Sequence, residues 1–294
     1  HHAKYAVVDD RALVLSENWK PAGVGGRSSR GWGVVLDSPV VASALARTFE
    51  ADAGYRDARP WAEVRDDVEA VEEPAANGRF PPRFEPTTVE VDRVDVLVTP
   101  DNAEAGLVDV IDGAERSVAV QQVSIGGLDG PFANATVRAT RRGVPARVLL
   151  SGAWYVEEDN RELATELTRL RRTEGLPVTA RLVTPRSRFR KSHVKALLVD
   201  GEAAVVGSLN WNAYAAQENR EVVVVLHDRE AAGYYGRVFE ADWRGGTWRL
   251  PMGFGAAVVL AAMVAGLGLA RSVEFEETVA GGAGGPIEPP SRVD

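Results

Sequence analysis

The chain has 294 residues, 45% of them hydrophobic, which is enough for one large domain or two small ones with a packed core. Its formal net charge is -8, so the molecule as a whole repels polyanions, and a phosphate-bearing ligand requires a local basic site. Cysteine is absent, which excludes disulfides, thiolate metal sites and cysteine nucleophiles.

Residues 1–53 predict a β-hairpin, a Gly/Ser-rich loop, a third strand and a helix. The strand AKYAVV is separated from ALVL by the turn sequence Asp9-Asp10-Arg11, and the helix is SPVVASALARTFEADAG. His2 and Lys4 stand two positions apart on the first strand, so their side chains point to the same face. The chain begins at His1 without a methionine, and we expect residues before it to be missing.

Residues 54–88 contain five prolines and many charges, and they predict a connecting segment. From residue 89 to 245, short β-branched runs alternate with longer helical ones. This alternation predicts an α/β layer with a largely parallel sheet and helices on its faces. HVKALLV and AAVVG read as two strands joined by a hairpin turn at Asp200-Gly201, followed by the strand REVVVVLHD and a closing helix.

The stretch 193–210 carries the pattern H-x-K-x4-D-x6-G-S-x-N, formed by His193, Lys195, Asp200, Gly207, Ser208 and Asn210. Six fixed positions in this spacing make a specific signal. An imperfect first copy consists of His2, Lys4, Asp9, Ser16 and Asn18. In that copy Leu15 replaces the glycine, one residue fewer precedes the serine, and Glu17 fills the variable position.

A second landmark also occurs twice. The tetrapeptide Phe-Glu-Ala-Asp stands at 49–52 and again at 239–242, near the end of the last predicted helix in each half. Two landmarks at nearly one offset make an internal duplication the simplest account. The second half has about a hundred α/β residues before its histidine and the first half has none, so we expect the first repeat to be incomplete.

The repeated pattern resembles the HKD motif of the phospholipase D superfamily, and the resemblance covers residues 1–243. That superfamily includes phospholipases D, cardiolipin and phosphatidylserine synthases, and certain endonucleases. The resemblance implies two phospholipase D-like α/β/α repeats, over residues 1–53 and 89–245, whose motifs face one active site. It also implies a phosphohistidine intermediate, which water hydrolyses or an alcohol intercepts, with His2 as nucleophile and His193 as general acid.

The residue types fit that chemistry independently. One imidazole can attack phosphorus while the other protonates the leaving oxygen, and Lys4 and Lys195 can neutralise the non-bridging oxygens. The side chains that can support those oxygens are Asn18, Asn210, Ser16 and Ser208. No metal or other cofactor is then required.

Glu221 begins the strand after the second motif and resembles the superfamily's acidic partner of the imidazole; the alternative is a solvated charge at a strand end. The segment SRGWGVV of the first copy has no glutamate at the matching place. We interpret Asp9, Asp200 and Gly207 as structural members of the motif, and His227 as a structural histidine.

The segment RSRFRK, residues 186–191, precedes the second motif. We expect it to form a basic lip that gathers phosphate, with Phe189 available to stack on a base or lipid headgroup; a solvated loop is the alternative.

Residues 250–270 are 21 consecutive uncharged residues, which as a helix would span roughly 30 Å, the thickness of a bilayer's hydrocarbon core. A buried Gly/Ala-rich helix is the alternative. We expect a transmembrane helix here, followed by a disordered acidic tail over 271–294. The protein is then a single-pass membrane protein with an extracytoplasmic catalytic domain.

The leading hypothesis is a metal-independent phosphodiester hydrolase or phosphatidyltransferase that acts on phospholipid. A nuclease acting on nucleic acid is the first alternative, and a non-catalytic, membrane-tethered phosphate-binding module is the second. The chemistry of the first two is identical, so the sequence separates them only through the acidic overall charge and the basic lip.

Overall fold

The computed structural model describes residues 1–24, 28–69, 77–78, 80, 83–183, 185 and 188–245. The expected membrane span at 250–270 and the acidic tail at 271–294 lie outside these residues. In the described part, no helix combines the length and apolar character that crossing a bilayer requires.

The expected hairpin, third strand and helix of the first 53 residues are present. They are β1 (Tyr5–Val8), β2 (Arg11–Leu15), β3 (Ser29–Arg30), β4 (Gly33–Asp37) and α1 (Pro39–Ala53). The described residues of the connecting segment that follows include α2 (Trp61–Val64) and a 3-10 turn (Arg65–Asp67).

The larger part of the chain alternates strands and helices as expected. Its elements in chain order are β5 (Arg93–Val98), α3 (Ala103–Asp112), β6 (Val118–Gln122), α4 (Pro131–Arg141), β7 (Ala146–Leu150), α5 (Glu157–Thr173), β8 (Val178–Leu182), β9 (Lys191–Ser192), β10 (Ala196–Val199), β11 (Ala203–Gly207), α6 (Ala213–Gln217), β12 (Val222–His227) and α7 (Arg229–Trp243).

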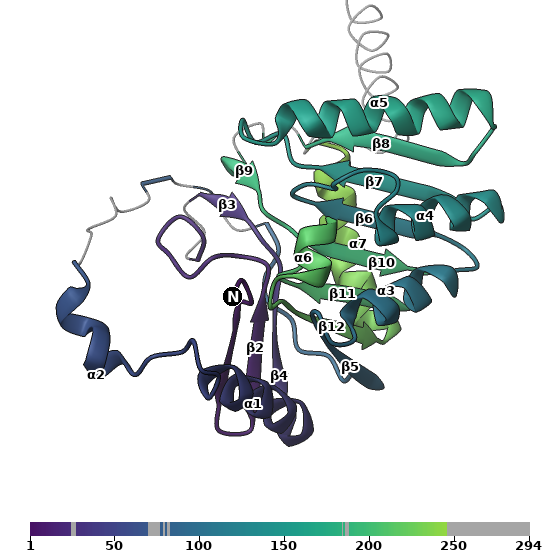
Figure 1. The fold of residues 1–294 in the computed structure, drawn as a ribbon. Coiled ribbons are helices and arrows are strands. Elements are labelled where there is room, and N and C mark those ends of the chain that lie inside the picture. Colours follow the sequence, from purple (N-terminus) through teal and green to yellow (C-terminus); the bar gives the residue numbers. More distant parts are fainter. Residues whose placement is uncertain are drawn as a thin grey trace, which may run out of the picture. The chain divides into compact units, whose positions relative to one another are not determined.

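The strands form a seven-stranded sheet in the order β5-β12-β11-β10-β6-β7-β8, a three-stranded sheet β1-β2-β4, and a short pair β3-β9 (Figure 1). The prediction of a largely parallel sheet was wrong. Only the pairings β6-β7 and β7-β8 of the large sheet are parallel, and its other four pairings are antiparallel. The tight turn between β10 and β11 forces antiparallel neighbours, and parallel neighbours occur only where α4 connects β6 to β7 and α5 connects β7 to β8.

Both predicted hairpin turns are confirmed. Asp200 and Gly201 have φ values of 57° and 68°, and Asp9 in the first copy has a φ of 51°. Positive φ at the centre of a two-residue turn matches the twist of the flanking strands, and Asp and Gly are among the residues that tolerate it. The motif's aspartates therefore stand at turns that reverse the chain after each H-x-K segment.

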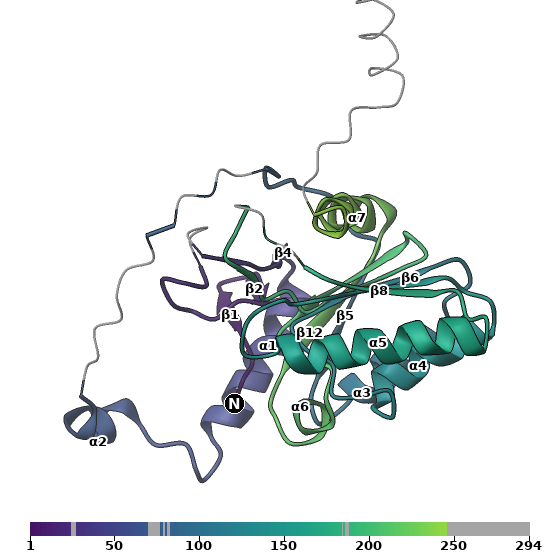
Figure 2. The same ribbon diagram turned by 90° about the horizontal axis from the view of Figure 1, so that it is seen from above.

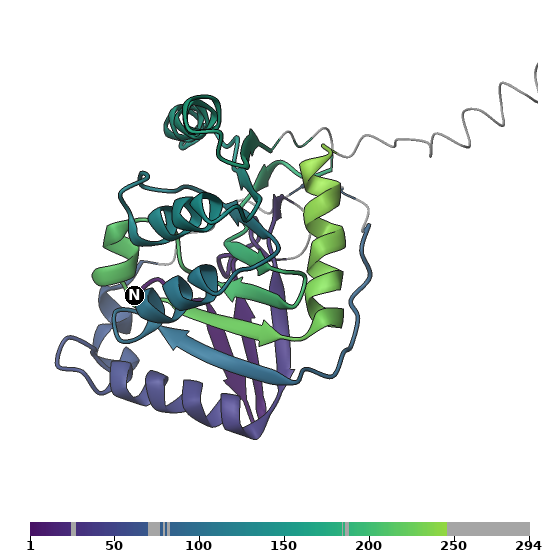
Figure 3. The ribbon, with the colours of Figure 1, turned by 90° about the vertical axis from the view of Figure 1, so that its right-hand side faces the viewer.

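The two faces of the large sheet have different partners. One face packs on α3, α4 and α5 through buried aliphatic residues such as Leu107, Val137 and Leu167. The other face packs on α7, α1 and the small sheet, through residues such as Val14, Leu45 and Phe239. Figures 2 and 3 show α7 on the opposite side of the large sheet from α3, α4 and α5. The small sheet thereby lies on the same face as α7, which brings the chain's first residues to the second motif.

Candidate active site

The two H-x-K segments lie immediately before β1 and β10, in extended backbone just outside the strands. Each histidine is anchored to the other copy through the backbone. The N–H of His2 donates to the carbonyl of Arg220 at 2.9 Å, and the N–H of His193 donates to the carbonyl of Arg30 at 2.8 Å. Segments more than 150 residues apart in the sequence are thus joined at one place.

The side chains of these two arginines explain the repeated Phe-Glu-Ala-Asp. Nε of Arg220 donates to Oδ1 of Asp52, at the end of α1, at 3.0 Å. Nε of Arg30 lies 3.7 Å from Oδ2 of Asp242, at the end of α7. Each tetrapeptide therefore ends in an aspartate that pairs with the arginine of the opposite copy.

His2 is held by Glu221. Nδ1 of His2 lies 2.6 Å from Oε1 of Glu221, a residue 219 positions away whose side chain is fully buried. Glu221 is fixed in turn because its N–H donates to the Thr99 hydroxyl at 2.8 Å and its Oε1 accepts from the Asn219 amide at 3.2 Å. The solvated alternative for Glu221 is excluded. With Nδ1 engaged, Nε2 is the nitrogen of His2 that remains to meet a substrate.

His193 is more enclosed than His2: 13% of its side chain is exposed, compared with 34%. Its Nδ1 lies 3.0 Å from the carbonyl of Ser16 and 3.5 Å from Oε2 of Glu17. Nζ of Lys195 lies 3.1 Å from Nδ1 and 3.4 Å from Nε2 of the same ring. Sequence reasoning noted Glu17 only as a departure from the motif and missed it as a neighbour of the imidazole.

The site is electrostatically strained, because several ionisable groups are withdrawn from water together. Burial lowers the pKa of Lys4 to about 8, and burial together with the Lys4 ammonium lowers the pKa of Lys195 to about 7. Burial and the neighbouring Lys195 lower the pKa of His193 to about 3. Burial raises the pKa of Glu17 to about 7. A bound anion would relieve the repulsion between the two lysines.

The two motif serines hold strands together. Both are fully buried. The Ser16 hydroxyl accepts from the N–H of Trp32 at 2.9 Å, and the Ser208 hydroxyl accepts from the N–H of Val222 at 3.1 Å. Ser208 thereby holds the backbone next to Glu221, and Ser16 holds the matching backbone of the first copy next to Trp32. Asn18 and Asn210 are half-buried, and Oδ1 of Asn210 has no hydrogen-bond partner among the described residues.

The motif glycine allows two strands to approach closely. A Cβ on Gly207 would lie 2.4 Å from the Val222 carbonyl and 2.6 Å from Cα of Val223, its partner on β12. In the first copy Leu15 faces Gly33, and a Cβ on Gly33 would lie 2.4 Å from Cδ2 of Leu15. A glycine on the facing strand therefore makes room for the leucine.

The two motif aspartates differ in their partners. Oδ1 of Asp200 accepts from the N–H groups of Arg116 and Ser117 at 2.7 Å, and Oδ2 accepts from that of Glu115 at 3.0 Å. These bonds tie the β10-β11 turn to the segment before β6. Asp9 stands at an exposed turn.

The expected basic lip is only partly accessible. Phe189 is 4% exposed and lies between the guanidinium groups of Arg30 and Arg188, so the prediction that it stacks on a ligand was wrong. Arg188 pairs with the buried Asp242 at 2.5 Å. Arg190 is exposed, and Lys191 lies over the Tyr155 ring at 4.9 Å from its centroid. Arg186 lies outside the described residues. Because the Phe189 ring packs between two guanidinium groups, residues 188–191 do not expose it to solvent.

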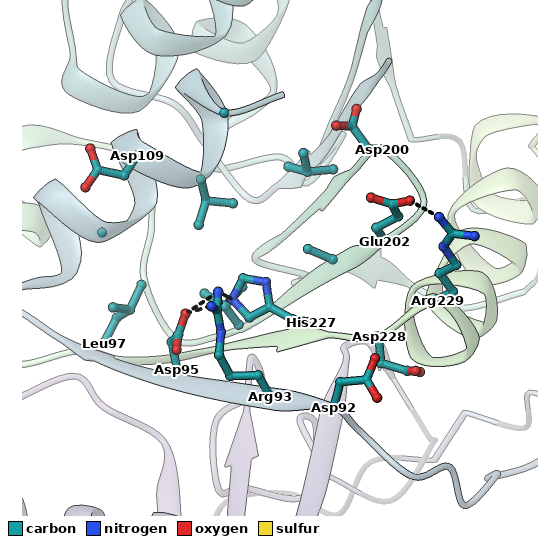
Figure 4. A pocket seen from close by; sticks show the side chains of 16 residues that line it. Asp92, Arg93, Asp95, Leu97, Asp109, Asp200, Glu202, His227, Asp228 and Arg229 are labelled. Carbon is teal, nitrogen blue, oxygen red and sulfur yellow. Dashed lines mark hydrogen bonds and ion pairs between the residues drawn. The ribbon is translucent and has the colours of Figure 1, made fainter. Parts of the chain in front are cut away.

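A hollow of about 830 Å³ (Figure 4) lies at the end of the large sheet opposite to His2 and His193. His227, at the end of β12, contacts Asp95 there at 2.7 Å and Arg93 at 2.8 Å, which agrees with a structural role. Acidic side chains predominate among those labelled in the figure. Among the described residues, no group of three or more His, Cys, Asp or Glu side chains is arranged to hold a metal ion.

In a comparison with known protein families, residues 107–243 match the family described as cardiolipin synthase, PLD-like domain. A phospholipase D of Rickettsia felis is 29% identical over 125 residues, which are 42% of this chain and 56% of that protein. A mitochondrial cardiolipin hydrolase of Xenopus tropicalis is 40% identical over 52 residues, 18% of this chain and 25% of that protein. The chain thus covers about half, or less, of these relatives.

Among solved structures, phosphatidylserine synthase of Haemophilus influenzae superposes with a TM-score of 0.57 at 13% identity, over 84% of this chain and 62% of that one. This likeness concerns the fold alone. Residues 107–243 are therefore similar to the phospholipase D-like domain of cardiolipin synthases, and the mixed α/β fold agrees with that similarity.

Proposed function

We propose that the protein is a metal-independent phosphodiester hydrolase or phosphatidyltransferase that acts on phospholipid through a phosphohistidine. The observation that carries this proposal is the juxtaposition of two H-x-K segments, each anchored to the other copy, with Glu221 at 2.6 Å from Nδ1 of His2. The names of the relatives, phospholipase D and cardiolipin hydrolase, support a lipid phosphodiester as substrate.

The first chemical step transfers the phosphoryl group to the protein. Nε2 of one neutral imidazole forms a bond to phosphorus, the bond from phosphorus to the leaving oxygen breaks, and the other imidazolium gives its proton to that oxygen. In the second step the now neutral imidazole takes a proton from water or an alcohol, whose oxygen displaces the histidine. Lys4 and Lys195 stabilise the non-bridging oxygens in both steps.

The resemblance implied His2 as nucleophile and His193 as general acid. The surroundings of the two imidazole rings favour the opposite assignment. His193 is enclosed and has an ammonium at 3.1 Å, which disfavours its protonation and suits a nucleophile. His2 has the buried carboxyl group of Glu221 at 2.6 Å from Nδ1, which fixes the ring, leaves Nε2 for the leaving oxygen and suits the general acid. We therefore propose that His193 attacks and His2 protonates the leaving oxygen.

Turnover of a chromogenic phosphodiester in the presence of EDTA tests the enzyme. We expect activity that survives EDTA and is lost in His2→Ala and in His193→Ala. For the roles, a substrate with a good leaving group should leave a phosphoryl label on the peptide containing residue 193 in His2→Ala, detected by mass spectrometry under alkaline conditions. A label on residue 2 in His193→Ala, and none on residue 193, would reverse the assignment.

The same measurements separate the alternatives. A nuclease would degrade oligonucleotides and leave phospholipid vesicles intact. A phosphate-binding module would turn over neither, and would bind phosphate undiminished in His193→Ala but not in Lys195→Ala. The burial of Phe189 weakens the case for nucleic acid, because the aromatic ring that was expected to stack on a base is unavailable.

We also propose that the two motif copies arose by duplication and that residues 250–270 anchor the protein in a membrane with its catalytic domain on the extracytoplasmic side. The paired arginine-aspartate contacts support the first proposal, and the run of 21 uncharged residues supports the second. Retention of the protein in membranes after alkaline carbonate washing would support the anchor. Release into the supernatant would contradict it.

A further inference from the structure

Glu17 has a position in this site that its place in the sequence does not explain. Its side chain is buried, Oε2 lies 3.5 Å from Nδ1 of His193, and Oε2 accepts from the Ser29 hydroxyl at 3.0 Å. Oε1 is also buried and has no hydrogen-bond partner among the described residues. A carboxyl group is thus turned toward the imidazole that the proposed mechanism needs to orient.

The contacts of the two serines define how the copies correspond. Ser16 bonds the N–H of Trp32, and Ser208 bonds the N–H of Val222 in the same way. Counting from these pairs, Glu17 corresponds to Leu209, and Gly31 corresponds to Glu221. The second copy therefore carries leucine after the serine and glutamate before the strand, whereas the first carries glutamate after the serine and glycine before the strand.

This exchange is sterically coupled. A Cβ on Gly31 would lie 2.1 Å from Cγ and 2.7 Å from Oε1 of Glu17, far inside van der Waals contact. The Glu17 side chain therefore occupies the space into which a side chain at position 31 would grow. The pair formed by Leu15 and Gly33 replaces Gly207 and Val223 by a similar exchange across two strands.

We propose that Glu17 is the positioning residue of His193, performing for that ring what Glu221 performs for His2, and that Gly31 is its required complement. The inference rests on the proposed two-histidine function. The Ser16 carbonyl accepts the Nδ1 proton, and the Glu17 carboxylate 3.5 Å from Nδ1 favours the same tautomer, which leaves the Nε2 lone pair directed at phosphorus. It also offsets the positive charge that the ring gains when Nε2 bonds to phosphorus.

The groups that set the charge of Glu17 come from several elements. Burial raises its pKa to about 7, while the Ser29 hydroxyl and nearby ammonium groups oppose that rise. The titratable side chains around it are Lys4, Tyr155, Lys191, His193 and Lys195. Because three of these are lysines, a substantial fraction of Glu17 is ionised at neutral pH.

The first experiment removes and then restores the carboxyl group. Glu17→Gln should lower kcat roughly a hundredfold or more, within the range of about 10²–10⁴ that a positioned acid or base contributes. Glu17→Leu and Gly31→Glu should each be as impaired. The double variant Glu17→Leu with Gly31→Glu reproduces the second copy and should recover at least about tenfold over Glu17→Leu. Glu50→Gln, on the exposed face of α1, is the matched control.

The second experiment is independent of turnover. In nitrogen-15 NMR spectra, Glu17→Gln should shift the imidazole signals of His193 and leave those of His2 unchanged, while Glu221→Gln should do the reverse. Unchanged His193 signals in Glu17→Gln would overturn the proposal, as would unchanged kcat, or a folded double variant no more active than Glu17→Leu. An inactive parent protein would refute the proposed function instead, and the NMR comparison would still decide whether Glu17 orients the ring.

Discussion

Lys4 and Lys195 are 6% and 2% exposed, and their ammonium groups share one site. Burial lowers the pKa of both amines, so an anion that binds between them should promote their protonation. We expect sulfate, whose own charge is constant over this range, to bind most tightly below pH 7 and to weaken as pH rises through 7 and 8. Ionisation of Glu17 over the same range acts in the same direction.

Calorimetry in buffers of different ionisation enthalpy checks this expectation. Sulfate binding near pH 8 should be accompanied by proton uptake, and Lys195→Met should abolish most of it. Affinity that is flat between pH 6 and 9 would show that the two ammonium groups do not receive the anion.

Burial of the Lys195 ammonium should lower the stability of the folded protein, although the proposed reaction uses that charge. Its folded pKa of about 7 lies below the unfolded value of about 10.4, so unfolding takes up a proton between those limits and stability rises with pH there. Lys195→Met should therefore raise the free energy of unfolding by about 2 kcal/mol at pH 7. The gain should shrink as pH rises and disappear only above about pH 10.4, where the amine is neutral in both states. Chemical denaturation at both pH values measures it, and a variant less stable than the parent at pH 7 would contradict the prediction.

At the scale of elements, the two motif aspartates should behave differently although they occupy equivalent turns. Asp200 accepts three backbone N–H groups that precede β6, and these bonds lower its pKa. Asp200→Asn should cost about 1–2 kcal/mol of stability at neutral pH, with the difference shrinking as acid protonates the carboxyl in the parent. Asp9→Asn is the matched control, because Asn also tolerates positive φ. Equal losses in the two variants would refute the assignment.

The helices α1 and α7 each end in an aspartate that binds an arginine, and the two pairs differ in burial. Asp242 is fully buried and faces both Arg30 and Arg188, whereas Asp52 retains 18% exposure. Removing one partner of a buried ion pair leaves an uncompensated charge, so Asp242→Asn should destabilise by about 3 kcal/mol or more. Asp52→Asn should lose less than half of that. Thermal unfolding of both variants makes the comparison, and a larger effect at Asp52 would be evidence against the burial argument.

At the scale of the whole molecule, local signals predicted the parts better than their assembly. The hairpins at Asp9 and Asp200 followed from turn chemistry, and Glu221 as the acidic partner of an imidazole followed from the resemblance, although only the structure identifies that imidazole as His2. Strand direction was mispredicted, because pairing depends on which distant strands share a core rather than on alternation along the chain. Phe189 was misassigned because its burial depends on two arginines from different segments.

Glu17 shows the same limit at the site. The sequence already contained the signal. The first copy has Glu17 where the second has Leu209, and it has Gly31 where the second has Glu221. Only the contact between Glu17 and Gly31 reveals that the two changes compensate each other, since sequence spacing alone does not show that residues 17 and 31 compete for one volume.

The net charge of -8 leads to a prediction about the class of substrate, because an acidic protein repels a long polyanion. A groove that tracks nucleic acid binds through released counterions, so its affinity rises steeply as salt is lowered, by a factor of about 10³ or more for six or more phosphate contacts between 200 and 50 mM. An acidic molecule with a small basic site repels the rest of a polyanion, and that repulsion strengthens as the Debye length grows to about 30 Å at 10 mM salt. A single-stranded oligonucleotide should therefore inhibit turnover of a chromogenic phosphodiester no more strongly at 10 mM than at 150 mM salt. A short phosphodiester with a zwitterionic headgroup serves as the control. Steeply stronger inhibition by the oligonucleotide at low salt would favour the nuclease and argue against the lipid substrate.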